Sequence, residues 1–112
     1  MEAITTRIVP GNGVCTLINV FTVAPERQAE LVKLLEEATE EVMRHLPGFI
    51  SANLHRSLDG TRVTNYAQWA SREHFEAMLR NPKAQVHMRA AAALVEQYEP
   101  HLYEVASTHA RA

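Results

Sequence analysis

The chain has 112 residues, 46% of them hydrophobic and 21% charged, which are the size and composition of one globular domain. Its formal net charge of −2 and isoelectric point near 6.3 argue against a general binder of nucleic acids or of anionic membrane surfaces. No apolar run approaches the roughly 20 residues that a membrane-spanning helix needs. Residues 1–13 lack the apolar core of a signal peptide, so we expect a cytoplasmic protein.

The chain divides into three segments. Residues 1–13 are polar, contain glycine and proline and show no period, so we expect a flexible arm there. Residues 14–108 are predicted to form the domain, and 109–112 a C-terminal tail. Cys15 is the only cysteine, which excludes an internal disulfide framework, and we interpret it as a small buried hydrophobic residue.

The first half of the domain is predicted to run strand, helix, strand, strand. β-branched and aromatic residues predict a strand over 14–23. A helix is expected from Pro25, which suits a first helical position, to about Leu46. Its apolar residues recur at helical spacing: Leu31, Leu34, Leu35, Ala38 and Val42. Two further strands, over 49–57 and around NYAQW (65–69), are joined by the hairpin-turn pair Asp59–Gly60.

The second half is predicted to add two helices and a strand. Ser71 suits the N-cap of a short helix carrying Phe75, Met78 and Leu79. Asn81–Pro82 ends that helix and begins another, which we expect to reach about Tyr98. Pro100 is taken to stop it, and 101–107 are predicted as the last strand. The order β-α-β-β-α-α-β is the ferredoxin-like α+β arrangement with an antiparallel sheet.

The first strand is apolar on both faces, which predicts a partner. Leu17, Phe21 and Val23 share one face, while Val14, Ile18 and Val20 share the other. A sheet with helices on one side should carry one polar face, and no further element of this chain remains to cover the second. We therefore expect a homodimer whose sheets pair face to face.

Polar residues on apolar faces indicate a small-molecule pocket. Asn19 lies on the Leu17 face of the first strand, and Asn65 shares its face with Trp69. The first and third strands are usually neighbours in this arrangement, so the two amides and Trp69 are predicted to line one cavity. His87, on the apolar stripe of the last helix, is predicted to point inward as well. Pockets are typically apolar clefts with a few placed polar groups.

Each of these residues has a structural alternative. A buried asparagine is usually a satisfied backbone bridge, a histidine on an apolar stripe is often a core or rim residue, and a strand tryptophan often belongs to the core. The sequence contains no Gly-rich phosphate loop, dinucleotide fingerprint or metal-binding histidine spacing. We expect any enzyme built on this chain to work without a tightly bound nucleotide or non-haem metal.

Three stretches resemble the antibiotic biosynthesis monooxygenase (ABM) domain. They are TLINVFTVAPERQAELVKLLEE, PGFISANLHRSLDGTRVTNYAQWAS and the helix after NPKAQ, in matching order from about Val14 to Ser107. The resemblance implies a ferredoxin-like unit that dimerises into an α+β barrel. Within the family the chain is most similar to the cofactor-independent anthrone oxygenases of aromatic polyketide pathways, which convert an anthrone to a quinone with O₂ as the co-substrate.

The resemblance implies which residues act on a small aromatic substrate. Asn19, Asn65 and Trp69 match the pocket residues of the anthrone oxygenases, where amide donors would favour a substrate carbanion and the indole would stack on it or donate its N–H. In one branch a histidine on the second strand and an arginine on the last helix contribute, and His55 and Arg89 occupy these positions.

The same branch has a tyrosine where this chain has Phe75, so a phenol at that position is lost and Phe75 is expected only to contact the substrate. His87 and His55 are the candidates for a general base, although the acidity of an anthrone can suffice.

Two alternatives remain. One branch of the superfamily degrades haem with a first-strand asparagine, a tryptophan on the helix after the third strand and an axial histidine on the last helix. Asn19 and His87 fit that pattern, whereas Met78 occupies the tryptophan position, which makes haem the less favoured cofactor. The third interpretation is a dimeric small-molecule-binding module that uses the same cleft without turnover.

Overall fold

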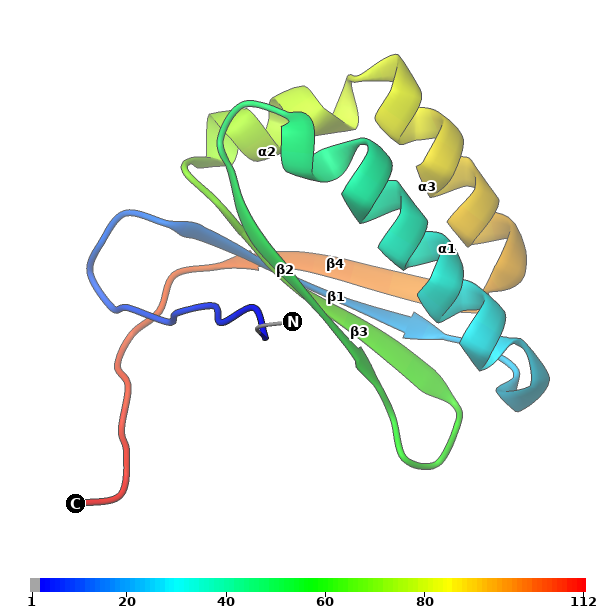
Figure 1. Ribbon diagram of the computed structural model, residues 1–112, viewed down its shortest axis with the longest axis horizontal. Helices are drawn as coiled ribbons and strands as arrows, with labels where there is room; N and C mark the ends of the chain where they lie inside the picture. Colours follow the sequence, from blue (N-terminus) through cyan, green and yellow to red (C-terminus); the bar gives the residue numbers. More distant parts are fainter. Residues whose placement is uncertain (1–2) are drawn as a thin grey trace.

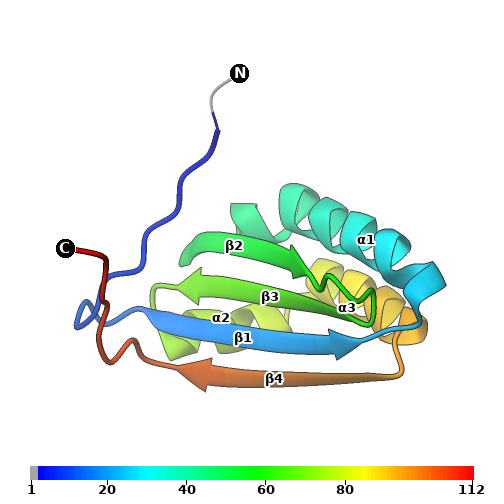
Figure 2. The same ribbon diagram turned by 90° about the horizontal axis from the view of Figure 1, so that it is seen from below.

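Four strands form one antiparallel sheet, and three helices lie on one of its faces (Figures 1 and 2). The computed structural model describes residues 3–112. The elements are β1 (Cys15–Thr22), α1 (Gln28–Glu41), β2 (Phe49–Arg56), β3 (Arg62–Trp69), α2 (Arg72–Leu79), α3 (Pro82–Leu94) and β4 (Gln97–Tyr103). Short 3₁₀ turns at Pro25–Arg27 and Met43–His45 extend α1 at both ends. The predicted ferredoxin-like order is confirmed, and the strands lie in the order β2-β3-β1-β4.

Local chemistry begins the two later helices as predicted. Ser71 Oγ accepts a hydrogen bond from the backbone N–H of His74 at 3.1 Å, which caps α2. Asn81 Oδ1 accepts from the N–H groups of Lys83 and Ala84, and Pro82 supplies the first residue of α3. These caps define the break between α2 and α3, and both helices lie over the same face of the sheet (Figure 1).

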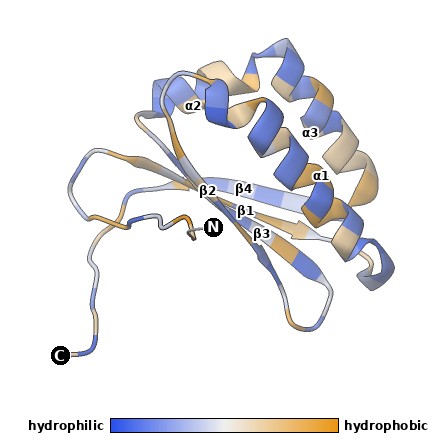
Figure 3. Ribbon diagram, viewed as in Figure 1, coloured by the Kyte–Doolittle hydropathy of each residue, from blue (hydrophilic) through white to orange (hydrophobic). Residues whose placement is uncertain are grey.

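The apolar residues of strands and helices meet in two clusters between the layers, and Figure 3 shows apolar and polar residues alternating along these elements. One cluster is centred on Trp69, Phe75 and Met78 and the other on Leu31, Val63 and Val23. Because side chains alternate along a strand, one face of β1 and β3 supplies the sheet side of both clusters. This face is called the inner face below, and the opposite face the outer face.

The last strand begins earlier than predicted. Helix α3 ends at Leu94 and β4 runs from Gln97 to Tyr103. A last strand is confirmed, but the predicted end of the helix at Tyr98 and the predicted strand bounds of 101–107 are wrong. Val95 is already extended, with φ −109° and ψ 156°. Pro100 lies within β4, where it pairs with Asn19, rather than ending a helix. An edge strand tolerates proline because one side of its backbone needs no ladder hydrogen bonds.

The segment before β1 covers part of the outer face. Thr6 Oγ1 donates to Asn53 Oδ1 and Gln68 Nε2 donates to the carbonyl of Arg7, both at 2.7 Å. Thr16, Ser51 and Gln68 are buried although they point away from the helices. Figure 1 shows the N-terminal segment on the side of the sheet opposite the helices. The expectation that no element of the chain remains for this face is therefore wrong for the part near Gln68. Within residues 3–112, no helix is long and apolar enough to cross a membrane.

Replacing Gly48 by alanine should destabilise the fold at the turn before β2. Gly48 has φ +82°, and a Cβ there would lie 2.2 Å from His74 Cγ. We expect Gly48→Ala to lower the free energy of unfolding by more than the roughly 1–2 kcal/mol of left-handed backbone strain alone. Gly11→Ala is the matched control, because Gly11 has φ +71° and no atom of residues 3–112 lies within 4 Å of its Cβ position. Equal losses in urea unfolding would contradict the His74 clash.

The β2–β3 hairpin should be acid-sensitive through Asp59. Its Oδ1 accepts hydrogen bonds from Ser57 Oγ and from the N–H and hydroxyl of Thr61, and these bonds, those from Thr61 foremost, lower the pKa of Asp59 to about 2. A depressed pKa in the folded state means that the stabilisation is present above the unfolded value near 4 and is lost as the pH falls toward 2.

Asp59 is the only aspartate in the chain, so its carboxyl carbon can be followed alone by NMR. We expect a midpoint near pH 2, and a stability difference between the unchanged chain and Asp59→Asn that shrinks between pH 4 and pH 2. A midpoint near 4 would show that the hairpin hydrogen bonds are not maintained in solution.

Candidate active site

A cavity of about 730 Å³ lies between the helices and the inner face of the sheet. Its wall is mostly apolar, with Leu17, Phe21 and Ala67 from the sheet and Phe75, Met78 and Met88 from the helices. A cavity of this size is typical of sites that hold a drug-sized organic molecule. Few polar side chains reach it, so each of them matters for what it can bind.

Asn19 and Asn65 line the cavity side by side. The register of β1 and β3 sets them directly opposite one another, an arrangement in which Cβ atoms are about 4.5–5.5 Å apart. The Oδ1 atoms of both are buried and have no hydrogen-bond partner within the described protein. The two amides are therefore not satisfied backbone bridges, and the prediction that they share one cavity is confirmed.

Trp69 stands at the end of the same face of β3 and is only 2% exposed. Its ring packs edge-on against Phe49 at 5.5 Å and against Phe75 at 6.5 Å between centroids. Its Nε1 is buried without a partner in the described protein. A buried indole N–H usually finds an acceptor, so this unpaired donor on the cavity wall is a place for a ligand oxygen.

His87 and Arg89 line the cavity from α3, at its rim. The His87 side chain is 25% exposed, and its Nε2 lies 4.0 Å from Glu41 Oε2 at the end of α1. Arg89 is exposed to solvent while still reaching the cavity. The His87 imidazole and the Arg89 guanidinium can therefore contact the polar edge of a ligand, but not its centre.

His55 does not reach the cavity. It pairs with Thr64 on the outer face, whereas Leu54 pairs with Asn65 on the inner face. The imidazole is exposed, with Nδ1 3.2 Å from the carbonyl of Asn53. His55 therefore cannot contact a ligand in the cavity of its own protomer.

The cavity also includes residues that the sequence did not point to. Thr39 and Met43 reach it from the end of α1, Gln85 from α3, and Tyr98, Pro100 and Leu102 from β4. Thr39 Oγ1 and Gln85 Nε2 already donate to the carbonyls of Leu35 and Leu79. The spacing of two residues between Tyr98, Pro100 and Leu102 indicates a strand with one face toward the cavity. This pattern was missed because the preceding helix was expected to reach Tyr98.

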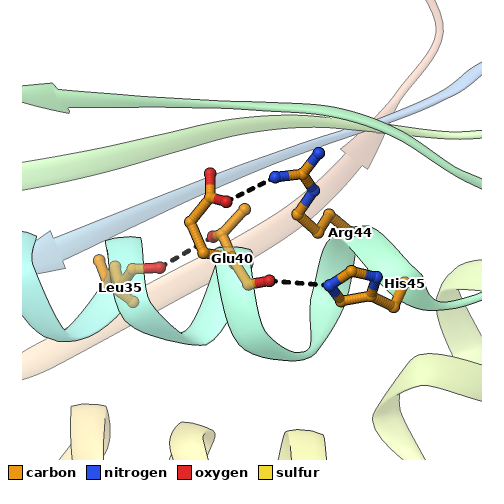
Figure 4. A network of polar contacts seen from close by, with 5 residues as sticks. Leu35, Glu40, Arg44 and His45 are labelled. Atoms are coloured by element: carbon orange, nitrogen blue, oxygen red, sulfur yellow. Dashed lines mark hydrogen bonds and ion pairs between the residues drawn. The ribbon is translucent and has the colours of Figure 1, made fainter.

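Polar contacts fix the end of α1 beside the cavity (Figure 4). Arg44 pairs with the Glu40 carboxylate at 2.6 Å, and His45 Nε2 lies 3.0 Å from the Glu40 carbonyl. The ion pair is exposed and adds little stability, but both contacts hold the turn that carries Met43.

Cys15 is half-buried and packs against the cluster around Trp69. Burial raises the pKa of its thiol, and the nearby Arg72 opposes that effect only in part. The thiol therefore stays protonated at neutral pH, as a small hydrophobic residue would require. Across residues 3–112, no group of three His, Cys, Asp or Glu side chains is arranged to hold a metal ion.

Known proteins resemble this chain in sequence and in fold. The chain is 51% identical over 80 residues to the tetracenomycin-F1 monooxygenase of Streptomyces glaucescens, covering 71% of each chain. Its structure resembles SnoaB, a cofactor-independent oxygenase from Streptomyces nogalater, with 28% identity, a TM-score of 0.74 and coverage of 86% and 96% of the two chains.

The monooxygenase ActVA-Orf6 of Streptomyces coelicolor, solved with the ligand nanaomycin D, is 27% identical with a TM-score of 0.77 and coverage of 89% and 93%. Residues 15–93 match the antibiotic biosynthesis monooxygenase family itself. These likenesses agree with the resemblance noted in the sequence and with an enzyme that needs no bound cofactor. The chain belongs to the antibiotic biosynthesis monooxygenase family and is a monooxygenase.

Proposed function

We propose that this protein oxidises a polycyclic aromatic substrate of the anthrone or phenol type to a quinone, using O₂ and no cofactor. The observation that carries the proposal is the set of three unpartnered buried polar atoms on an otherwise apolar cavity wall, namely Asn19 Oδ1, Asn65 Oδ1 and Trp69 Nε1. Buried polar groups are normally paired, so side chains left in this state are suited to pairing with a ligand.

An electron-rich substrate can supply the chemistry itself. An anthrone methylene loses a proton to give a delocalised carbanion, which passes one electron to O₂. The two radicals combine at carbon to form a peroxide, and loss of water leaves the carbonyl. The methylene thereby loses two hydrogens and gains one oxygen atom, while the second oxygen atom leaves as water.

The side chains suit the two tasks left to the protein, which are to hold the ring flat and to favour the anion. A carboxamide presents both a donor and an acceptor, so Asn19 and Asn65 can donate to the developing oxyanion and accept from a neighbouring phenol. The Trp69 N–H can donate to a second oxygen of the substrate or to the peroxide. His87, at the rim of the cavity, can accept the proton, and the acidity of the anthrone methylene means that no stronger base is needed.

The named relatives support the same class of substrate. One acts on tetracenomycin F1, one is a cofactor-independent oxygenase, and one was solved with nanaomycin D. The mostly apolar cavity wall suits a polycyclic aromatic ligand of this class.

Removing a carboxamide or the indole N–H should reduce turnover. With emodin anthrone or dithranol under O₂, and quinone followed by absorbance, we expect Asn65→Ala to lower kcat by about 10²–10³-fold, as loss of an oxyanion donor does. Trp69→Phe should cost about tenfold or more, the value of a hydrogen bond to a charged group. Asn53→Ala is the control, because Asn53 lies on the outer face of the sheet.

Stability gives a second measurement of the same residues. Asn65→Leu should leave the free energy of unfolding unchanged or raise it, since it removes an unsatisfied buried group. A clear loss of stability would restore the structural-bridge interpretation of Asn65.

Unchanged oxidation of every tested anthrone by Asn65→Ala and Trp69→Phe would overturn the proposed site. Binding of the anthrone without turnover would favour a small-molecule-binding module. In a separate titration with haemin, a shift of the Soret band would favour a haem-binding protein.

We also propose that two copies pair through the part of the outer face that the N-terminal segment leaves open. Ile18 and Val20 are only half-buried there, beside Tyr66 and Thr64. Apolar strand residues facing solvent are expected to pair with a second apolar surface.

Light scattering tests this pairing. We expect a mass of twice the 12.6 kDa of one chain. Ile18→Glu should shift the protein to the single-chain mass, whereas Leu58→Glu, in the exposed hairpin loop, should leave the mass doubled. A single-chain mass for the unchanged protein at micromolar concentration would contradict the pairing.

A further inference from the structure

The cavity wall formed by β4 differs from the other walls because most of its residues are exposed to solvent. Tyr98, Pro100 and Leu102 alternate along the strand and share its inner face, where they line the cavity. β4 lies at the edge of the sheet, hydrogen-bonded to β1, and six of its seven residues are exposed (Figure 2). Leu102 packs against the cluster around Trp69, whereas Tyr98 and Pro100 are held by a regular strand but remain exposed.

Tyr98 has one face packed and one face free. It pairs with Phe21 of β1, and the two rings lie 6.4 Å apart at an angle of 37°. Phe21 is 7% exposed whereas Tyr98 is 53% exposed. Phe21 thus supports the phenol ring from the core side, and the rest of the ring is available to a ligand in the cavity.

Tyr98 also lies close enough to the Asn19–Asn65 pair for one polycyclic ligand to reach both. Pro100 pairs with Asn19, and Tyr98 is two residues along the same face of β4. At about 3.4 Å per residue, Tyr98 is about 7 Å along the strand from the level of the amides. Trp69 lies four residues from Asn65, about 13 Å in the opposite direction along the sheet. The amides therefore lie between two aromatic ends, with Tyr98 at the nearer one.

We propose that Tyr98 is a specificity-determining residue, whose ring stacks on the part of a polycyclic ligand that extends past Asn19 toward the β4 edge. The inference rests on the proposed function in one respect, that the ligand is a flat aromatic polycycle. Offset stacking favours a ring system long enough to reach Tyr98 over a shorter one.

Binding can be measured without turnover, because Trp69 is the only tryptophan and lies in the cavity. Its fluorescence would be titrated with emodin, a tricyclic hydroxyanthraquinone. Tyr98→Ala should weaken emodin binding about three- to tenfold through loss of stacking, and Tyr98→Phe should stay within about twofold. Tyr103→Ala is the matched control, since Tyr103 is 47% exposed on the same strand but pairs with Thr16 on the outer face.

Three results would overturn the role of Tyr98. They are unchanged emodin affinity in Tyr98→Ala, equal weakening in Tyr103→Ala, and no emodin binding by the unchanged chain. If Tyr98→Ala lowers the melting temperature, Tyr98→Leu keeps a large apolar side chain without the aromatic ring and should show the same weakening. A protein that binds emodin through Tyr98 but oxidises no anthrone would support this inference and contradict the oxygenase proposal. Active oxidation with no effect of Tyr98 would do the reverse.

Discussion

The antiparallel register between β1 and β3 is the constraint on which the site depends. It sets Asn19 against Asn65 and, on the same face, Leu17 against Ala67 and Phe21 against Val63. A slip of one residue would turn every one of these side chains to the opposite face of the sheet. Since the apolar pairs on either side of the amides must stay under the helices, hydrophobic burial of the neighbours holds the polar pair in the cavity.

The site carries a cost in stability that the rest of the core offsets. A buried polar group without a partner costs about 1–3 kcal/mol, against a total stability of about 5–15 kcal/mol for a typical domain. Two carboxamide oxygens and an indole nitrogen are left in this state on one wall. Leu31, Val23 and Val63 are fully buried in the second cluster, and Trp69, Phe75 and Met78 are buried in the first. Apolar packing in both clusters therefore offsets the unmet hydrogen bonds of the cavity wall.

How far the sequence could predict the structure depends on how local each signal is. Alternation along two strands and the β-α-β order were sufficient to bring Asn19 and Asn65 together, and Ser71 and Asn81 correctly began their helices. Pro100 was ambiguous, because a proline that ends a helix and a proline in an edge strand look alike without the neighbouring strand. His55 was assigned to the pocket from the resemblance. It alternates with Leu54, which pairs with Asn65, so His55 lies on the other face of the sheet from Asn65. That the two amide oxygens have no partner among residues 3–112 could not be predicted, because it depends on every atom around them.

The contacts of Thr6 and Arg7 with Asn53 and Gln68 have a consequence for assembly. The segment before β1 lies on the same side of the sheet as Ile18 and Val20, so a second copy that docks on this side meets the segment as well as the strands. The segment then becomes part of a shared boundary, and its side chains can bond to either copy's sheet. Ordering of the N-terminal segment and association of two chains would in this way be one thermodynamically linked event, separate from the chemistry on the inner face.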